Sequence, residues 1–343
     1  MTLSVGIRGL GRIGRNLFRL LYARDDIRIA GISEIADPAG LEYLLRFDTT
    51  LGRFPDEISI REGHIYVAGR QIPLLSEKEG VQTPWGELGV DTLLEATSRP
   101  RPRQELARHL DAGAKRVISL APPDPADPPD AVAVMGLNDD RLSSAHRIVS
   151  NASSTVHCVA PILKILGEAF GIRRAMFTTV HSYTSEHRLA DVPAKDKRTG
   201  RAAAENIIPQ ASRSPAMLVD LLPELEGRIT GSAMSVPVRN GSLVDLVCWH
   251  ERKISKTALN EVVRTAAATR RWNRYLKFEV EPIVSSDVAH SPFSSVYDSL
   301  ATMSMGDSVS KTVSWFDSGY GYAYRALDLL GRFAELDGGK GNA

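Results

Sequence analysis

Residues 3–14 read Leu3-Ser-Val-Gly-Ile-Arg-Gly-Leu-Gly-Arg-Ile-Gly14, and this stretch decides the fold. Its first part, residues 3–7, is mostly apolar and partly β-branched, which predicts a short buried strand. Residues 15–22 place apolar side chains at helical spacing. Between the predicted strand and the predicted helix stands a G-x-G-x-x-G motif, which consists of Gly9, Gly11 and Gly14 with Arg12 and Ile13 between the last two glycines.

A glycine motif at this position is typical of dinucleotide binding. The first glycine allows a tight turn, the second lets the backbone approach a pyrophosphate, and the third allows helix and strand to pack closely. The start of the helix then presents free N–H groups and its positive dipole end to the phosphates. A glycine-rich turn without a ligand is the alternative interpretation, and the flanking strand and helix favour the cofactor site.

An acidic residue after the second predicted strand favours NAD as the cofactor. The strand at 27–32 is followed by Ser33 and Glu34, and Glu34 lies 20 residues after Gly14. A carboxylate at this distance can accept hydrogen bonds from the adenosine ribose, and it would repel the 2′-phosphate of NADP. We therefore expect NAD, with Thr97 near the end of a later strand also at the site. A solvated Glu34 is the weaker alternative.

Strands and helices alternate through the first part of the chain. A helix is predicted at 41–48, an edge strand with Pro73 at 71–75, a strand at 90–95, a helix at 103–112 and a strand at 116–120. This order predicts an α/β fold that opens with a doubly wound parallel sheet, a Rossmann domain at 1–150. Later strands (175–180, 232–236, 243–249, 309–316) and a helix at 257–267 predict a second, α+β domain at 151–317 with a mixed or antiparallel sheet.

The composition excludes several classes of protein. The chain has 343 residues, 43% of them hydrophobic and 24% charged, and a formal net charge of +1. This length supports two cores, and the balanced charge gives no sign of a nucleic-acid or membrane partner. The two cysteines, Cys158 and Cys248, argue against a disulfide scaffold and for a reducing compartment. We see no signal peptide or long apolar span, and we expect a cytoplasmic protein without a metal.

The segment Ser150-Asn-Ala-Ser-Ser-Thr-Val-His-Cys-Val-Ala-Pro161 resembles the active-site signature S-N-A-S-C-T-T-N-C-L-A-P of phosphorylating glyceraldehyde-3-phosphate dehydrogenase. The resemblance extends in order over some 320 positions, and similar segments lie at 11–15, 44–48, 113–118, 135–138, 178–181, 200–209, 222–227 and 315–322. It implies a cytoplasmic homotetramer whose final helix, within 318–343, packs back on the cofactor domain. It implies less about the activity, because a fold does not fix a function.

The resemblance places Ser154 where the family carries its nucleophilic cysteine, and it aligns His181 with the histidine beside that cysteine. A thiol near pKa 8.5 is within reach of local tuning, whereas an aliphatic hydroxyl lies far above that range. Ser154 would therefore need His181 as a general base, and a divergent paralogue with little phosphorylating activity is expected. For Ser154, a helix N-cap is the structural alternative. Cys158 matches the family's second cysteine and is expected to pack in the core.

The resemblance also implies altered ligand contacts. At the substrate end the chain keeps the family's residues at Thr155, Thr184 and Arg198. Ser212 aligns with a phosphate-binding turn of the family. Ser235 stands where the family has an arginine that contacts both phosphates. Arg213 and Arg239 are new cations, either a reshaped site for an anionic substrate or ordinary surface charges. At the cofactor end Tyr322 is retained, Ser318 replaces an asparagine that positions the nicotinamide, and Arg8 replaces an asparagine before Gly9.

Two functions stay open. The first is an NAD-dependent oxidoreductase that acts on a small, anionic aldehyde, oxo or hydroxy compound. In it His181 is the general acid or base, Ser154 bonds the substrate oxygen and Arg198 holds the anionic group. The second is an NAD-binding paralogue without dehydrogenase activity, in a regulatory role or in another reaction. The retained His181, Thr155, Thr184 and Arg198 favour the first, and the changes at 154, 235 and 318 motivate the second.

Overall fold

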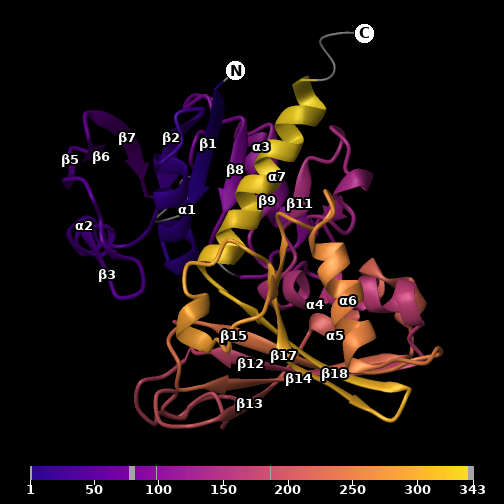
Figure 1. Ribbon diagram of the computed structural model, residues 1–343. Helices are drawn as coiled ribbons and strands as arrows, with labels where there is room; N and C mark the ends of the chain where they lie inside the picture. The colour runs from indigo at the N-terminus through magenta and orange to yellow at the C-terminus, as the bar shows by residue number, and fades with distance from the viewer. Residues whose placement is uncertain (1, 77–81, 98, 186, 339–343) are drawn as a thin grey trace. The chain divides into compact units, whose positions relative to one another are not determined.

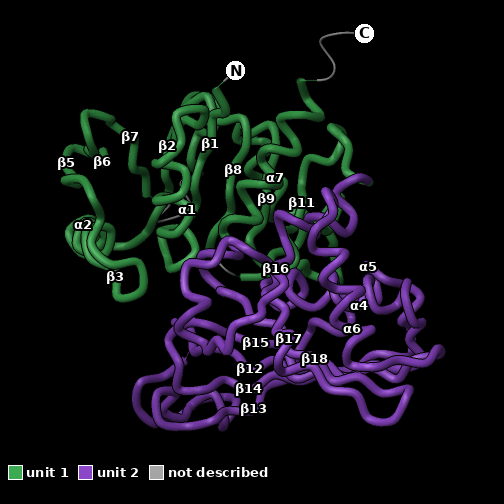
Figure 2. The backbone as a smooth tube through the Cα atoms, viewed as in Figure 1, with its two compact units in different colours: residues 1–133, 141–152, 323–343 green, residues 134–140, 153–322 purple. Residues whose placement is uncertain are grey.

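The computed structural model describes residues 2–76, 82–97, 99–185 and 187–338 (Figure 1). The chain divides into two compact units (Figure 2). The first unit consists of residues 1–133, 141–152 and 323–343, and the second of residues 134–140 and 153–322. The glycine motif therefore belongs to the first unit, and Ser154 lies near the start of the long segment of the second.

The first unit is built on one sheet, whose strands among the described residues are β1 (Leu3–Arg8), β2 (Ile27–Ser33), β5 (Ile58–Arg61), β6 (His64–Val67), β7 (Arg70–Leu75), β8 (Thr92–Glu95), β9 (Arg116–Ser119), β10 (Ala131–Val132) and β11 (Ile148–Ser150). Their order is β10-β11-β9-β8-β1-β2-β7-β6-β5. Every neighbouring pair from β10 to β7 is parallel. This is the doubly wound sheet that the alternation of strands and helices predicts.

The ends of the helices in this unit follow from capping residues and from glycine and proline positions. α1 (Arg12–Tyr22) follows the glycine motif, and α3 (Arg103–Asp111) precedes β9. α2 (Pro38–Arg46) begins earlier than the predicted helix at 41–48, because Asp37 accepts a hydrogen bond from the Gly40 N–H and a proline occupies the first turn. It also ends earlier, because Phe47 is extended and begins a strand. Two short strands, β3 (Phe47–Asp48) and β4 (Gly52–Arg53), then pair with each other.

The prediction that residues 71–75 form an edge strand is wrong. β7 lies between β2 and β6, with parallel pairing to β2 and antiparallel pairing to β6. Pro73 lacks an N–H group, and the pairing with β2 is confined to Leu74 and Leu75, after the proline. The hairpin of β5 and β6, which the sequence analysis did not predict, covers the other side of β7.

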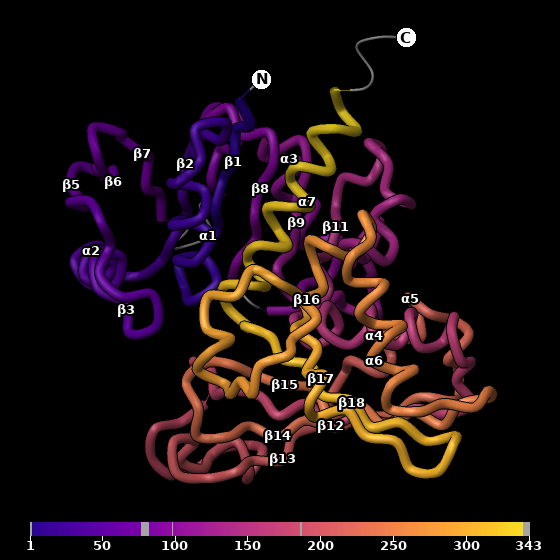
Figure 3. Tube along the Cα trace, viewed as in Figure 1, coloured from indigo at the N-terminus to yellow at the C-terminus, as the bar shows by residue number. Residues whose placement is uncertain are grey.

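The second unit contains a mixed sheet of β12 (Arg174–Ser182), β13 (Ile208–Ala211), β14 (Ile229–Val236), β15 (Ser242–Trp249), β16 (Leu276–Glu279), β17 (Ser295–Met305) and β18 (Val309–Phe316). Their order is β13-β14-β12-β15-β18-β17-β16. The pairs β12–β14 and β16–β17 are parallel, and the other neighbours are antiparallel. The mixed sheet is thus confirmed, and Figure 3 shows its strands running from magenta to yellow along the chain.

Three helices, α4 (Ser154–Phe170), α5 (Ser214–Leu221) and α6 (Lys256–Ala267), lie on one side of this sheet (Figure 1). α4 buries Val159, Ile162 and Leu166 almost completely. The last helix, α7 (Tyr320–Gly338), belongs to the first unit from Ala323 onward. Among the helices that the structure describes, none is long and apolar enough to cross a membrane.

Candidate active site and cofactor site

The predicted cofactor residues of the first unit gather at the carboxyl ends of three neighbouring strands. Gly9 follows β1, Glu34 follows β2 and Thr97 lies two residues after β8. β1 lies between β2 and β8, and the order of strands reverses there. In doubly wound sheets, ligands bind in the crevice at such a reversal point.

The glycine loop has the shape that a pyrophosphate needs. Gly9 has a φ of +89°, which favours glycine. A Cβ on Gly14 would lie 1.9 Å from the Gly9 carbonyl oxygen, so only glycine allows α1 to approach the loop this closely. A Cβ on Gly11, the residue before α1, would meet nothing within 4 Å. Open space beside Gly11 at the start of a helix fits a bound phosphate group.

The two residues between the last glycines have different surroundings. Arg12 is half-buried and begins α1, whereas Ile13 is buried in the core of the first unit. The side chain of Ile13 therefore packs, and a contact with the cofactor would come from the backbone of this turn.

Glu34 holds the glycine loop. One carboxylate oxygen accepts a hydrogen bond from the backbone N–H of Leu10, within the motif, and the other accepts from the N–H groups of Ile35 and Ala36 at 2.7 and 3.0 Å. The carboxylate thus ties the end of β2 to the loop. Within the described residues, the oxygen bonded to Leu10 accepts only this one hydrogen bond, so it keeps a lone pair for a ribose hydroxyl.

Thr97 is held by a buried ionic network around Glu95. The Thr97 hydroxyl donates to Glu95, and Arg8 donates to the same carboxylate at 2.9 Å. Burial by itself would raise the pKa of Glu95, but the His109 hydrogen bond and the Arg8 charge outweigh it. Thr97 and Arg101 add to this effect, and the pKa of Glu95 is lowered to about 2. Arg8 at the end of β1 and Thr97 after β8 are therefore both bonded to the ionised Glu95 carboxylate.

In the second unit, Ser154 is the first residue of α4. The N-cap is Ser153, whose Oγ accepts a hydrogen bond from the Val156 N–H at 3.2 Å, so the interpretation of Ser154 as the cap is wrong. Ala152, two residues earlier, is buried with a φ of +50°, a strained conformation of the kind that clusters at functional sites. Within the described part of the chain, the Ser154 hydroxyl makes no hydrogen bond.

Thr155 and Cys158 lie deeper in α4. Thr155 is 8% exposed and Cys158 is fully buried. The Cys158 thiol lies 3.5 Å from the Ser314 carbonyl oxygen. Burial raises the pKa of Cys158 to about 12, and it does the same for Cys248. Neither thiol is available as a thiolate at neutral pH, which agrees with the packing role predicted for Cys158.

His181, near the end of β12, has a fixed orientation. Its Nδ1 lies 2.6 Å from the carbonyl oxygen of Ser182. A carbonyl only accepts hydrogen bonds, so Nδ1 carries a proton, and whenever the ring is neutral Nε2 is its acceptor. The ring stands edge-on to Phe316, with centroids 5.9 Å apart. This arrangement suits a general base that acts through Nε2.

No sequence motif points to His187, which joins Thr184 of the predicted substrate site to Ser235 and Gln210. Its Nδ1 lies 3.1 Å from both the backbone nitrogen and the hydroxyl of Thr184. Its Nε2 lies 2.9 Å from the Ser235 hydroxyl and 2.7 Å from the Gln210 side chain. A single histidine in a loop gives no periodic signal, and only the folded chain shows these neighbours.

The predicted cationic residues lie at the surface. Arg198, Arg213 and Arg239 are all exposed. The Ser212 hydroxyl accepts a hydrogen bond from the Ser214 N–H at 3.2 Å, next to the start of α5. The role of these four residues as a substrate site stays a prediction.

Ser318 and Tyr322, predicted at the nicotinamide, belong to the second unit. Ser318 is 4% exposed and Tyr322 is 7% exposed. The Tyr322 ring stands edge-on to His157 of α4, with centroids 6.2 Å apart. Both residues are therefore buried, Ser318 just before α7 and Tyr322 in its first turn.

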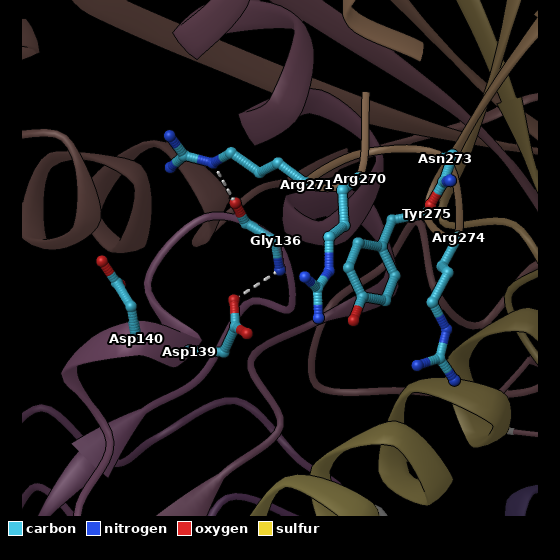
Figure 4. Close-up of a pocket in the computed structure, with 8 residues that line it drawn as sticks. All are labelled: Gly136, Asp139, Asp140, Arg270, Arg271, Asn273, Arg274 and Tyr275. Atoms are coloured by element: carbon cyan, nitrogen blue, oxygen red, sulfur yellow. Dashed lines mark hydrogen bonds between the residues drawn. The ribbon is translucent and has the colours of Figure 1, made fainter. Parts of the chain in front are cut away.

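A separate hollow of about 700 Å³ also lies in the second unit (Figure 4). Arg271 holds its wall through hydrogen bonds to the carbonyl oxygens of Gly136 and Leu137 at 2.6 and 3.1 Å. None of the predicted site residues lines it; its lining is Gly136, Asp139, Asp140, Arg270, Arg271, Asn273, Arg274 and Tyr275.

A Rossmann-type sheet with this glycine loop and a second domain carrying His181 define the class of NAD-binding oxidoreductases. Residues 3–101 match the family domain described as glyceraldehyde 3-phosphate dehydrogenase, NAD binding domain, and residues 153–318 match the C-terminal domain of the same family. The chain belongs to the glyceraldehyde-3-phosphate dehydrogenase family, and NAD is its cofactor.

Three bacterial relatives are similar over nearly the whole chain. The glyceraldehyde-3-phosphate dehydrogenase of Geobacillus stearothermophilus is 42% identical over 97% of this chain and 99% of its own. That of Streptomyces coelicolor is 42% identical over 96% and 98%. Glyceraldehyde-3-phosphate dehydrogenase 1 of Bacillus subtilis is 39% identical over 98% and 99%.

Proposed function

We propose that the chain is an NAD-dependent oxidoreductase that oxidises a small aldehyde, as its hydrate, or a related hydroxy compound by direct hydride transfer, without a covalent thioester. The observation that carries the proposal is the fixed His181 ring, whose Nε2 is the acceptor while Nδ1 is bonded to the Ser182 carbonyl. This is the tautomer that a general base requires.

Ser154 takes the position of the family's nucleophile in this proposal, but as a hydrogen-bonding group. Its hydroxyl makes no hydrogen bond to His181 within the described chain, and such a bond is what an activated serine nucleophile uses. A hydroxyl at the first residue of α4 can instead donate to the substrate oxygen. The positive end of the helix stabilises negative charge that develops there.

His181 accepts the proton of the substrate hydroxyl while the C–H bond breaks. When bound, NAD accepts the hydride from that carbon. An aldehyde hydrate and NAD⁺ then give a carboxylic acid, NADH and one proton, and an alcohol gives the carbonyl compound. Glu34, the glycine loop and Thr97 would hold the adenosine and pyrophosphate, and Ser318 and Tyr322 would contact the nicotinamide.

The remaining assignments are part of the same proposal. Thr155, Thr184 and Arg198 would contact the substrate, and an anionic group on it would meet Arg198, Arg213 or Arg239. A cytoplasmic homotetramer is proposed from the family. NAD is expected to bind more tightly than NADP, and calorimetry in which NADP binds equally well or better would overturn the role of Glu34.

The test is the formation of NADH from a panel of small aldehydes, sugar phosphates and hydroxy acids. We expect one group of these compounds to be oxidised, and His181→Ala to lower kcat by about 10²–10⁴-fold, the usual contribution of a general base. His64→Ala, a change at a half-buried histidine of β6 in the first unit, is the control and should have no effect on kcat. Measurable NAD binding without NADH formation from any compound would favour the non-dehydrogenase alternative.

A further inference from the structure

The cluster of Thr184, His187, Gln210 and Ser235 has a defined protonation state. The backbone N–H of Thr184 points at His187 Nδ1 at 3.1 Å. A backbone N–H only donates, so Nδ1 is an acceptor and the ring proton is on Nε2. A doubly protonated, charged ring would place two N–H donors against each other. In this arrangement His187 is therefore neutral.

The proton on Nε2 determines the rest of the cluster. It faces the Ser235 hydroxyl at 2.9 Å and the Gln210 amide nitrogen at 2.7 Å. Two N–H groups do not bond each other, and the oxygen and nitrogen of an amide are nearly indistinguishable in shape, so the proton on Nε2 requires the Gln210 amide to be turned by 180°, with its oxygen towards the ring. Ser235 receives the Nε2 proton, so its own hydrogen cannot go to this ring. Ser235 is only 2% exposed, and a buried O–H needs an acceptor.

The register of the sheet places this cluster beside His181. Ser235 of β14 is the direct partner of His181 in the parallel β12–β14 pair. Partner residues on parallel strands face the same side of the sheet about 4.8 Å apart. Gln210 pairs with Ala233, two residues before Ser235, and so lies on that side too. A substrate at His181 Nε2 would have the cluster as its neighbour.

None of the four side chains carries a charge in this arrangement. A phosphate dianion at the cluster would lose water and gain only neutral hydrogen bonds, and an unpaired buried charge is costly. An uncharged hydroxyl group matches the cluster better, because it both accepts from the Ser235 O–H and donates to a neighbouring oxygen. Arg188, Arg213 and Arg239 adjoin these segments in sequence, but all three are exposed.

We propose that Thr184, His187, Gln210 and Ser235 form a neutral hydrogen-bonding site that binds an uncharged, hydroxyl-bearing group of the substrate in preference to a phosphate. The proposal rests on the proposed function, because it assumes that the substrate lies at His181. A charged group elsewhere on the substrate is compatible with it.

The kinetic test compares D-glyceraldehyde with D-glyceraldehyde 3-phosphate as substrates with NAD. The wild type should favour the uncharged aldehyde in kcat/KM by about tenfold or more, as sites built around specific hydrogen bonds do. Ser235→Ala should lower kcat/KM for the uncharged aldehyde about three- to tenfold, mainly through KM, the effect of one lost hydrogen bond. Ser235→Arg should reverse the preference. A wild-type preference for the phosphorylated aldehyde that Arg213→Ala or Arg239→Ala abolishes would overturn the proposal.

A second measurement does not depend on turnover. Long-range ¹H–¹⁵N NMR of ¹⁵N-histidine-labelled protein reports the protonation of each ring, and His187→Gln assigns the His187 signal. We expect a neutral ring with its proton on Nε2 at pH 7, which shifts when D-glyceraldehyde is added and not when inorganic phosphate is added. His250, whose ring is bonded to Gly171 and Ser310, is the internal control.

The two measurements separate the two proposals. The expected NMR response without any NADH formation would leave the cluster standing and contradict the proposed function. A charged His187 ring, or a His187 signal that shifts with phosphate and not with glyceraldehyde, would contradict the cluster whatever the activity.

Discussion

The reactivity at position 154 depends on the pKa difference between a serine hydroxyl and a cysteine thiol. Each pKa unit is worth about 1.4 kcal/mol, or tenfold in the ionised fraction. A helix N-terminus and an imidazole together supply a few such units, which ionise a thiol at neutral pH but not a serine. The remaining thiols offer no substitute, because burial raises the pKa of both Cys158 and Cys248 to about 12.

We therefore predict that iodoacetamide does not label the native wild type at pH 7. Ser154→Cys should be labelled rapidly at residue 154, and mass spectrometry of the peptides distinguishes the sites. This variant alone should oxidise glyceraldehyde 3-phosphate poorly, and Ser154→Cys with Ser235→Arg should do so better. Full activity in the single variant would show that the pocket still accepts phosphate. Rapid labelling of Cys158 in the folded wild type would contradict its buried position.

Two glycines of one motif give a matched pair of variants. Gly14→Ala would force a methyl group to 1.9 Å from the Gly9 carbonyl oxygen, and it should destabilise the protein by about 3 kcal/mol, the upper range of overpacking. Gly11→Ala meets no atom within 4 Å and should leave the stability within about 0.5 kcal/mol of wild type. It should nevertheless weaken NAD binding about tenfold or more, because the methyl group occupies the approach to the pyrophosphate.

Urea denaturation and calorimetry with NAD measure these two effects separately. Equal loss of stability in both variants would contradict the close approach at Gly14. Unchanged NAD affinity in Gly11→Ala would contradict the position of the pyrophosphate.

At the scale of the elements, β1 and β8 are joined by Glu95 as well as by their ladder. The pKa of Glu95 is lowered from 4.5 to about 2, so its charged form stabilises the fold above pH 4.5. This contribution, about 3 kcal/mol at pH 7, disappears as the pH falls from 4.5 towards 2. Protonation removes the ionic bond to Arg8 while the carboxyl stays buried.

We predict that the stability difference between wild type and Glu95→Gln is largest at neutral pH and shrinks between pH 4.5 and 2. Urea denaturation at several pH values measures it. Asp26→Asn removes an exposed carboxylate that also has an arginine partner, and it should show little change over the same range. A difference for Glu95→Gln that stays constant with pH would contradict the low pKa.

Elements with a strong local signal could be predicted from the sequence, and those defined by long-range pairing could not. β1, α1 and β2 follow from apolar periodicity and the glycines, and α6 lies at Lys256–Ala267 where 257–267 was expected. β7 was misjudged because a proline is usually found at an edge, whereas here pairing with β2 starts only after Pro73.

The residues of the candidate site also fall into those with a local sequence signal and those that only the folded chain brings together. Ser154 and His181 carry motif signals, and the change at Ser235 is visible in the sequence. The ring that covers Ser235 is not, because His187 reaches it across 48 positions of the chain. Likewise, the sequence allowed Ser154 to be a cap, and only the fold shows that Ser153 has this role.

For the molecule as a whole, the two domain matches and the full-length similarity establish the family and the cofactor. We propose that this chain does not use the covalent, phosphorylating route. Phosphate enters that route as the acceptor of an activated acyl group, and an ester at a serine is less reactive towards phosphate than a thioester.

The most direct test is the initial rate of NADH formation from glyceraldehyde 3-phosphate, with and without inorganic phosphate, beside glyceraldehyde-3-phosphate dehydrogenase 1 of Bacillus subtilis under the same conditions. The account predicts a rate more than about tenfold below that of the relative, the equivalent of one pKa unit, and no increase with phosphate. A phosphate-dependent rate within about tenfold of the relative would contradict it, because His181 would then activate Ser154 far more strongly than a hydroxyl allows.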